Sequence, residues 1–454
     1  MQKLMNVKRG KNMKRRIVAL VVCTAMLMAG CGAKATPEES AQSGSTKDEK
    51  VTLKILTCDE AVDEEMIQAF KDENPNIDVD LTFVPSGDYA GKFSALASSN
   101  DIPDVLWTQA GYYADQVGEG LLMDLSKELD GKSYEGDRTW RESFEPALLE
   151  NCESIIKQAH PNETSFDYAV PFSMVSVAVL YDKNVYEKLG LSVPETWEDF
   201  LGNCEALKNE GLIPISVQSP TTIDWMPRLF WDQFCRKELD EEGKKFEDGT
   251  MTFQTESVKK SLEECKALWD KGYITDNMLT ADIETVQQMF IQGKLGHLLI
   301  APDKLEYLMN NAPDTMELGT CVLPGIAGLP SRSMGGSGII FAASANTEHP
   351  EEAVTFLKYL TSKTNFETDP GLKYRNAGVK GITKDDAELN ELLAGFNKAA
   401  ENGFCPELYV PVTVTTEIKT AFLTDLYPNY LMGNYELDDI CDKLQTMYEE
   451  YRAK

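Results

Sequence analysis

The chain has 454 residues, and at roughly 100–200 residues per domain it is long enough for two or three domains. It carries 74 acidic and 44 basic side chains and a formal net charge of −30, which argues against nucleic acid or an anionic membrane surface as its main partner. Its 10 cysteines form no C-x-x-C motif, and its 3 histidines show no helical spacing. The sequence therefore predicts no metal and no cofactor.

Residues 1–30 have the pattern of a secretory signal peptide. Lys and Arg residues without any acid precede the apolar run 17–29, which is shorter than the roughly 20 residues that span a bilayer. The run ends in Met28-Ala29-Gly30-Cys31, which resembles a bacterial lipobox with Met in place of the usual Leu. The resemblance implies that Cys31 carries lipid and anchors the protein to the outer side of the cell membrane. The alternative is an ordinary signal peptide with an incidental cysteine.

Residues 31–50 are predicted to be a flexible linker, because they are small, polar and charged without an apolar period. Export would permit disulfides in the body that follows. The cysteines of that body are widely spaced, unlike those of a dense disulfide framework. We therefore expect mostly buried free thiols, with room for one bridge that the sequence does not assign.

From residue 51 the chain alternates between strand and helix patterns. Strand patterns occupy 51–55, 77–83 and 104–107, and helical spacing occupies 66–70 and 89–97. This β-α-β-α-β order predicts an α/β sheet with helices on both faces. In such sheets ligands bind at the loops beyond the carboxyl ends of the strands.

A second unit of the same kind starts near residue 168. Strands are predicted at 178–181, 213–215, 295–300 and 339–341, and helices at 194–200, 286–290, 350–360 and 437–448. Thr196 is a suitable N-cap for the helix it opens, and Gly293 is a suitable residue to follow the helix at 286–290. The sequence shows no internal repeat.

Short motifs follow one another in order along residues 51–450. The longest series is Tyr168-Ala169-Val170-Pro171-Phe172, Leu180-Tyr181-Asp182-Lys183, Pro194-Glu195-Thr196-Trp197 and Gly211-Leu212-Ile213-Pro214. Later motifs are Phe290 with Gly293-Lys294, Gly335-Gly336-Ser337-Gly338 and Pro350-Glu351-Glu352-Ala353. Together, and behind a lipobox, they resemble the extracellular solute-binding protein family 1, which supplies the sugar-binding subunits of ABC importers.

This resemblance implies a type II, periplasmic-binding-protein-like α/β fold, in which two lobes joined by a hinge close on ligand in the cleft between them. Lobe one would comprise 51–171 and 335–405, and lobe two 172–334 and 406–454. The implied protein is a monomer without enzymatic activity. Its implied partners are a sugar or oligosaccharide and the membrane permease subunits of an ABC importer.

A sugar needs an aromatic ring against its apolar face and polar groups around its hydroxyls. Trp107 is the first candidate for the ring, with Gln109 and Tyr112 beside it in the same loop. The first-strand loop and the next helix add further candidates, namely Asp59, Glu60, Asp88 and Tyr89. The alternatives are that Trp107 and Tyr89 only pack in the core, and that the acidic pair is a solvated turn.

Other candidates come from the second lobe and the hinge. Asp224 and Trp225 would bind from lobe two, although Trp225 is equally suited to core packing. The remaining candidates follow the first crossing, a later strand and the second crossing, and they are Ser173, Ser176, Pro302, Asp303, Gly335, Gly336 and Ser337. The two glycines would let the backbone approach a ligand, or would only make the hinge flexible.

Two competing functions remain open on the sequence alone. One is a lipid-anchored binding protein for a peptide or another solute, and the other is a secreted polysaccharide hydrolase. A serine hydrolase would carry G-x-S-x-G, but Gly335-Gly336-Ser337-Gly338-Ile339 has Ile where the last Gly should be. Candidate aromatic residues outnumber basic ones among the proposed site residues, which favours a neutral sugar.

Overall fold

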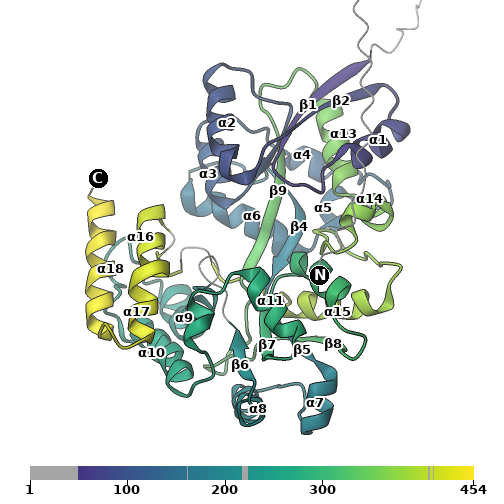
Figure 1. Ribbon diagram of the computed structural model, residues 1–454. Helices are drawn as coiled ribbons and strands as arrows, with labels where there is room; N and C mark the ends of the chain where they lie inside the picture. The colour runs from purple at the N-terminus through teal and green to yellow at the C-terminus, as the bar shows by residue number, and fades with distance from the viewer. Residues whose placement is uncertain (1–49, 161, 217–222, 407–408, 413, 454) are drawn as a thin grey trace, which may run out of the picture. The chain divides into compact units, whose positions relative to one another are not determined.

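The computed structural model describes residues 50–160, 162–216, 223–406, 409–412 and 414–453. The predicted signal peptide, Cys31 and the linker up to residue 49 lie outside these ranges. Two separate β-sheets with surrounding helices form the described chain (Figure 1). No helix in the described ranges is both long enough and apolar enough to cross a membrane.

The first sheet has five strands in the order β2-β1-β3-β9-β4. Their bounds are β1 (Val51–Thr57), β2 (Ile77–Phe83), β3 (Val105–Thr108), β4 (Val170–Ser176) and β9 (Gly335–Ala343). Strand β1 runs parallel to β2 and β3, whereas β9 is antiparallel to β3 and β4. The three strands predicted between residues 51 and 107 are confirmed. Because β1 and β3 are parallel neighbours, the loops that follow them lie at the same edge of the sheet.

Helices from residues 64–159 and from residues 350–368 pack on this sheet. They are α1 (Glu64–Glu73), α2 (Ser86–Ser98), α3 (Ala110–Gly118), α4 (Ser126–Leu129), α5 (Trp140–Ser143), α6 (Pro146–Ala159), α13 (Pro350–Leu360) and α14 (Lys363–Thr368). Asp63 begins α1, because its side chain accepts hydrogen bonds from the backbone N–H groups of Glu65 and Met66. The helix then buries Met66 and Phe70, and Phe70 packs edge-on against Phe356 of α13 with ring centroids 5.1 Å apart.

The second sheet has four strands in the order β6-β7-β5-β8. Their bounds are β5 (Ala178–Asp182), β6 (Ile213–Ser216), β7 (Leu295–Ile300) and β8 (Leu318–Cys321). All six residues of β7 are buried, as expected for a central strand covered on both faces. The predicted strands at 178–181, 213–215 and 295–300 are therefore confirmed.

The helices of the second core pack partly on the second sheet and partly on one another beside it (Figure 1). They are α7 (Lys183–Leu189), α8 (Trp197–Asn209), α9 (Trp225–Arg236), α10 (Glu256–Asp270), α11 (Ile283–Ile291), α12 (Leu305–Asn311), α15 (Ala387–Ala399), α16 (Thr416–Ala421), α17 (Tyr427–Leu431) and α18 (Leu437–Arg452). Shorter helical turns here are η1 (Lys237–Glu241), η2 (Asp276–Leu279), η3 (Pro302–Lys304) and η5 (Phe422–Leu426), whereas η4 (Pro370–Leu372) belongs to the first core, where Leu372 is buried. In Figure 1 the C-terminal helices α17 and α18 lie beside α10. Thr196 caps α8 through a reciprocal pair of hydrogen bonds with Asp199, which confirms the predicted N-cap.

Each sheet has its own hydrophobic core, and the division between the cores differs from the predicted lobe boundaries. Strand β4 belongs to the first sheet as far as Ser176, so the chain first crosses after residue 176 and not at Pro171. Helix α15 buries Leu389 and Phe396 in the second core, although 387–399 was assigned to lobe one. The chain thus passes between the cores near 177, 335–339 and 373–386.

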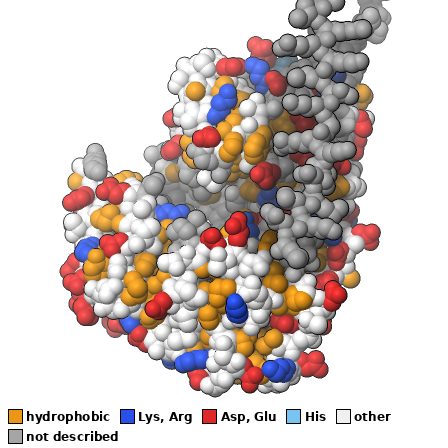
Figure 2. Space-filling view, viewed as in Figure 1, with side chains coloured by type: hydrophobic (Ala, Val, Ile, Leu, Met, Phe, Trp, Pro, Cys, Tyr) orange, Lys and Arg blue, Asp and Glu red, His pale blue; other side chains and the backbone are white. Residues whose placement is uncertain are grey.

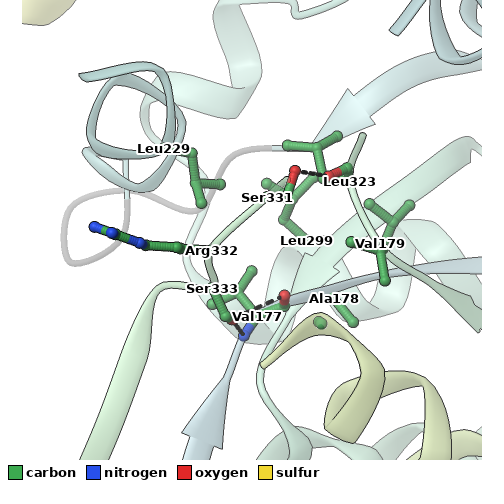
Figure 3. A pocket seen from close by; sticks show the side chains of 11 residues that line it. Val177, Ala178, Val179, Leu229, Leu299, Leu323, Ser331, Arg332 and Ser333 are labelled. Carbon is green, nitrogen blue, oxygen red and sulfur yellow. Dashed lines mark hydrogen bonds between the residues drawn. The ribbon is translucent and has the colours of Figure 1, made fainter. Parts of the chain in front are cut away.

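Ser333 connects the first two of these crossings. Its hydroxyl accepts a hydrogen bond from the backbone N–H of Val177 at 2.7 Å, and its backbone carbonyl accepts one from the N–H of Cys405 at 2.8 Å. Figure 3 shows the contact with Val177 beside a small pocket lined mainly by apolar side chains, including Leu229 and Leu323. This pocket belongs to the packing of the crossing segments.

Gly335 and Gly336, which the sequence offers as residues that approach a ligand or make the hinge flexible, are the first two residues of β9. Gly335 and Gly336 have φ angles of 110° and 121°, which side-chain-bearing residues rarely adopt. A Cβ atom on Gly336 would lie 2.6 Å from the side-chain oxygen of Asn151, and one on Gly335 would clash with the carbonyl of Val175. These glycines are needed because β4 and α6 approach the β9 backbone closely.

Candidate functional site

The loop after β1 places a carboxylate inside the protein. Asp59 is only 4% exposed, and its Oδ1 accepts hydrogen bonds from the backbone N–H of Ala61 at 2.9 Å and from Arg375 Nη2 at 2.6 Å. Its Oδ2 is buried and has no hydrogen-bond partner among the described residues. Burial raises the pKa of Asp59, and Arg375 opposes this effect. The neighbouring Glu60 is exposed, as a turn residue would be.

Arg375 was not among the predicted site residues. It lies in the crossing segment after η4, and its partner Asp59 is 316 positions away in the sequence. The residues directly after Arg375 are bonded to β4, since Met174 N–H donates to Asn376 O at 2.8 Å and Gly378 N–H donates to Phe172 O at 3.0 Å. No local motif around Tyr374-Arg375-Asn376 indicates this long-range pairing.

Lys384 lies near the end of the same segment. It is 7% exposed, and its Nζ donates hydrogen bonds to the carbonyls of Phe366 and Leu372 at 2.6 and 2.8 Å. Burial lowers its pKa to about 8. Lys384 and Arg375 line a polar pocket together with Asn376 and Asn397, whose side chains are hydrogen-bonded at 2.8 Å. The lysine thus secures the backbone from which Arg375 extends.

Three aromatic side chains gather near the carboxyl end of β3. Tyr89 of α2 packs edge-on against Trp107 with ring centroids 4.9 Å apart, and its hydroxyl donates to the Trp107 carbonyl at 2.5 Å. Tyr112 lies 6.1 Å from Tyr89 and 6.2 Å from Trp107 between centroids. Trp107 is only 6% exposed and Tyr89 is buried, whereas Tyr112 is half-buried. Of the three rings, Tyr112 offers the most free surface to a ligand.

The rest of this region agrees only partly with the expected loop. Tyr112 lies in the first turn of α3 and not in a loop, because α3 begins directly after Gln109. Gln109 is the N-cap residue of α3, and its exposed side chain makes no capping hydrogen bond. Asp88 is exposed in the first turn of α2. Gln109 and Asp88 therefore have accessible polar groups near the aromatic cluster.

Cys58 links the acidic loop to the aromatic cluster. The thiol is half-buried, and burial together with the negative charge of Asp59 raises its pKa to about 11. It lies close enough to Tyr89 to contribute to the raised pKa of that phenol, whose main cause is burial. Asp59 and the three rings are thus neighbours at the edge where β1 and β3 both end.

Asp303, next to the second sheet, lies close enough for its charge to change the pKa of Asp59. It follows β7 in the turn η3, where it is exposed and paired with Lys304 at 2.7 Å, and the adjacent Pro302 is buried. The negative charges of Asp303 and Glu60 both raise the pKa of Asp59. Asp303, which the sequence places after a different strand from Asp59 and Glu60, therefore lies within electrostatic reach of them.

Other predicted site residues have structural partners. The Ser176 hydroxyl donates to the carbonyl of Phe396 at 3.0 Å, and the Ser337 hydroxyl donates to that of Leu148 at 2.7 Å. Ser173 is buried in β4 with an unpartnered hydroxyl. All three serines lie in β4 or β9, and the hydroxyls of Ser176 and Ser337 join these strands to α15 and α6.

Asp224 and Trp225 lie at the start of α9. Asp224 is buried with its Oδ2 3.7 Å from Nη1 of Arg228. Trp225 is partly buried against the second core, and Trp231 on the same helix is completely buried. The strand–helix connection before them, 217–222, lies outside the described residues. The part of the Trp225 side chain that is buried against the second core is therefore as the core-packing alternative predicts.

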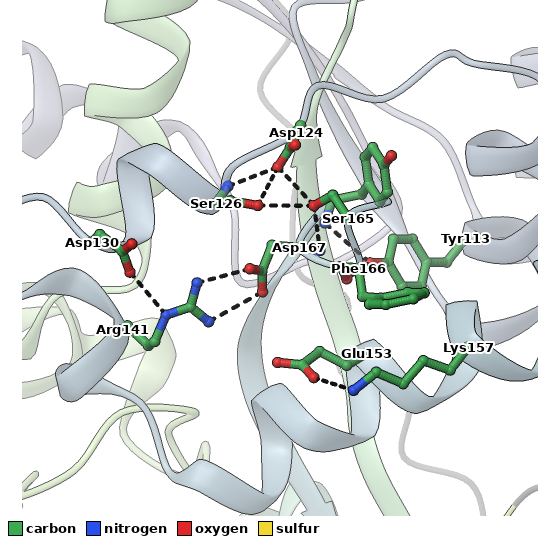
Figure 4. Close-up of polar contacts among 11 residues, drawn as sticks. Tyr113, Asp124, Ser126, Asp130, Arg141, Glu153, Lys157, Ser165, Phe166 and Asp167 are labelled. Carbon is green, nitrogen blue, oxygen red and sulfur yellow. Dashed lines mark hydrogen bonds and ion pairs between the residues drawn. The ribbon is translucent and has the colours of Figure 1, made fainter. Parts of the chain in front are cut away.

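Charged side chains elsewhere form local pairs. Figure 2 shows Asp and Glu side chains spread over the displayed face and not gathered in one patch. Figure 4 shows Arg141 of α5 bound by two hydrogen bonds to Asp167, with Asp130 as a further partner. No group of three His, Cys, Asp or Glu side chains in the described ranges could hold a metal ion.

Comparisons with known proteins agree on one family. The sequence model of the bacterial extracellular solute-binding protein family matches residues 59–365. The multiple sugar-binding protein of Streptococcus mutans is 23% identical over 96% of this chain and 97% of its own length. The melibiose/raffinose/stachyose-binding protein MelE of Bacillus subtilis is 23% identical over 84% of each chain.

Solved structures show the same fold. RafE of Streptococcus pneumoniae superposes with a TM-score of 0.69 at 19% identity, covering 90% of this chain and 100% of its own. The sugar-binding protein MalE of Xanthomonas citri superposes with a TM-score of 0.71 at 16% identity, covering 89% and 98%. These likenesses confirm the predicted two-lobe binding-protein fold.

Proposed function

Because the chain belongs to the family of bacterial extracellular solute-binding proteins, whose members are transport proteins and not enzymes, we propose that it binds a sugar or oligosaccharide for an ABC importer. The observation that carries the proposal is the group at the carboxyl edge of the first sheet. There a buried carboxylate with a free oxygen, Asp59, lies beside an aromatic cluster of which Tyr112 is partly exposed. A sugar needs these two kinds of surface.

The proposed ligand lies between two lobes. We assign lobe one to 51–176, 335–372 and lobe two to 178–334, 387–453, following the two cores in place of the boundaries expected from the sequence. Asp59, Glu60, Asp88, Gln109 and Tyr112 would bind from lobe one, and Asp303, Asp224 and Trp225 from lobe two. Trp107 and Tyr89 would act mainly by supporting Tyr112.

The proposed location is the outer side of the cell membrane. Cys31 of the lipobox-like motif would carry the lipid, and residues 31–50 would tether the body as a monomer that delivers its ligand to the permease subunits. One relative, 21% identical over 83% of this chain, is a lipoprotein named LipO from Bacillus subtilis. Membrane fractionation of the full chain and of Cys31→Ser tests this part, since only the variant should leave the membrane fraction.

A thermal-shift screen of residues 50–454 tests the ligand class. The panel is raffinose, stachyose, maltotriose, xylotriose, chitobiose and a mixture of short peptides. A ligand that binds only the folded protein stabilises it by about 2.7 kcal/mol at 100 times its Kd. We expect a shift with at least one sugar, no shift with peptides, and the sugar recovered intact.

A matched pair of variants locates the site. Tyr112→Ala removes the most accessible ring of the cluster and should weaken the sugar-dependent shift. Tyr451→Ala removes an exposed tyrosine of α18 and should leave that shift unchanged. A shift with peptides only, or degradation of the sugar, would replace the proposal with one of the two alternatives.

A further inference from the structure

The two carboxylate oxygens of Asp59 differ, because only one of them accepts hydrogen bonds from the described residues. Oδ1 receives Arg375 Nη2 and the backbone N–H of Ala61, whereas Oδ2 is buried and has no donor within the described protein. A buried oxygen of a carboxylate without a hydrogen bond is costly, because it has lost its water without receiving a donor. A ligand that supplies an O–H or N–H group would remove that cost.

The charges around this oxygen are mostly negative. The groups that act most strongly on Asp59 are Arg375, Glu60 and Asp303, and two of these three are acidic. Arg375 already contacts Oδ1, and Lys304 is paired with Asp303. A ligand carboxylate at this place would face the acidic side chains of Asp59, Glu60 and Asp303. Both cations among these groups already have acidic partners.

Arg375 is held in place by its surroundings. Its side chain is 22% exposed, its own backbone N–H donates to Leu372 O at 3.0 Å, and the residues directly after it are hydrogen-bonded to β4 at Asn376 and Gly378. Lys384 binds the carbonyl of Leu372 just before it. Because the arginine is fixed, it determines which oxygen of Asp59 is used and which stays available.

We propose, building on the sugar-binding function above, that Arg375 is a positioning residue that directs Asp59 Oδ2 toward the ligand, and that the site selects uncharged hydroxyl-bearing sugars against uronic acids. Arg375 acts through Asp59 and does not itself contact the sugar. The three acidic groups supply the discrimination, since the same carboxylate that accepts a hydroxyl repels a carboxylate.

Isothermal titration tests the positioning role. The probe is whichever panel sugar binds the wild type, measured with Arg375→Gln, Arg375→Lys and the control Arg141→Gln. Arg141 forms a similar arginine–aspartate pair on the same sheet's helices but contacts none of the site residues. We expect at least tenfold weaker binding for Arg375→Gln, a smaller loss for Arg375→Lys, and no change for Arg141→Gln.

The pH dependence separates positioning from a general structural effect. Removing Arg375 should raise the pKa of Asp59 further, with Cys58, Glu60 and Asp303 unchanged around it. The affinity of Arg375→Gln should therefore decline at a higher pH than that of the wild type as the solution is acidified. Equal affinities and equal pH profiles for the wild type and Arg375→Gln would overturn the role of Arg375.

A third measurement needs no variant, so it remains informative where Arg375→Gln fails to fold. The wild type is titrated with galactobiose and digalacturonate, and with xylotriose and its glucuronic-acid-substituted counterpart. Binding of neutral members only supports the selection, whereas binding of an acidic member as tightly as its neutral counterpart overturns it. If the wild type binds no sugar at all, the proposed sugar-binding function itself fails. If it binds neutral and acidic sugars equally, only the proposed selection against uronic acids fails.

Discussion

The hydroxyl of Ser333 accepts the backbone N–H of Val177 at 2.7 Å, which fastens the second chain crossing to the first. Ser333→Ala leaves this buried N–H without its acceptor, and we expect a loss of about 1–3 kcal/mol in the free energy of unfolding. Urea denaturation followed by circular dichroism measures it. Ser98→Ala removes an exposed serine hydroxyl of α2 and should cost less than about 0.5 kcal/mol. Equal losses in both variants would contradict the role of Ser333.

Tyr89→Phe should lower the free energy of unfolding while its ring stays in the aromatic cluster. The change removes only the hydroxyl that donates to the Trp107 carbonyl, so we expect a loss of about 1 kcal/mol. Tyr451→Phe at an exposed site is the matched control and should be neutral within about 0.5 kcal/mol. The same urea titration measures both, and a Tyr89→Phe protein as stable as the control would show that this hydrogen bond adds nothing net.

His297 should make the fold sensitive to mild acid. It is completely buried beside Tyr186, whose hydroxyl lies 2.6 Å from its Nε2, and burial lowers its pKa to about 4 from 6.5. Between these values the unfolded chain binds the extra proton, so stability falls as the pH falls. From pH 7.5 to 5 we expect this residue to remove about 2 kcal/mol.

Comparing pH profiles isolates the histidine. His297→Gln cannot take up the proton, so its free energy of unfolding should change less with pH than that of the wild type, whatever the starting stability of the variant. His160 and His349 remain in both proteins and cancel in the comparison. Parallel profiles from pH 7.5 to 5 would show that His297 is not the responsible group.

Arg141 and Arg138 offer a comparison of two arginine–aspartate pairs. Arg141 binds both carboxylate oxygens of the largely buried Asp167, at 3.2 and 2.8 Å, whereas Arg138 pairs with the exposed Asp137. Arg141→Gln should cost about 2 kcal/mol, because it leaves a largely buried charge without its partner. Arg138→Gln should cost less than about 0.5 kcal/mol. Thermal unfolding at two salt concentrations checks both, and equal losses would contradict this ranking.

Local sequence patterns predicted much of the fold correctly, because they report burial and capping directly. The alternating residues of β1 and β2 and the capping box at Thr196 depend on neighbours close in sequence. Gly335 and Gly336 show the limit of such patterns. A glycine pair is typical of a loop, yet here it lies in β9 because β4 and α6 come close to it.

The candidate site was predictable only in part for the same reason. Asp59 and Asp303 were predicted as candidates because each follows a recognisable strand, whereas the contact between Arg375 and Asp59 joins residues far apart in the sequence and left no local pattern. Trp107 was predicted as the exposed ring, but the packing of Tyr89 over it is a tertiary contact, and it leaves Tyr112 more accessible.

The eight cysteines of the described body are all free, and seven of them are buried. Burial raises the pKa of the buried thiols, as at Cys152, where it reaches about 12, so they stay protonated and react slowly with oxidants. The fold thus has no covalent cross-link between these cysteines to make or lose. For these eight cysteines, a change between oxidising and reducing surroundings therefore has no native disulfide to form or break.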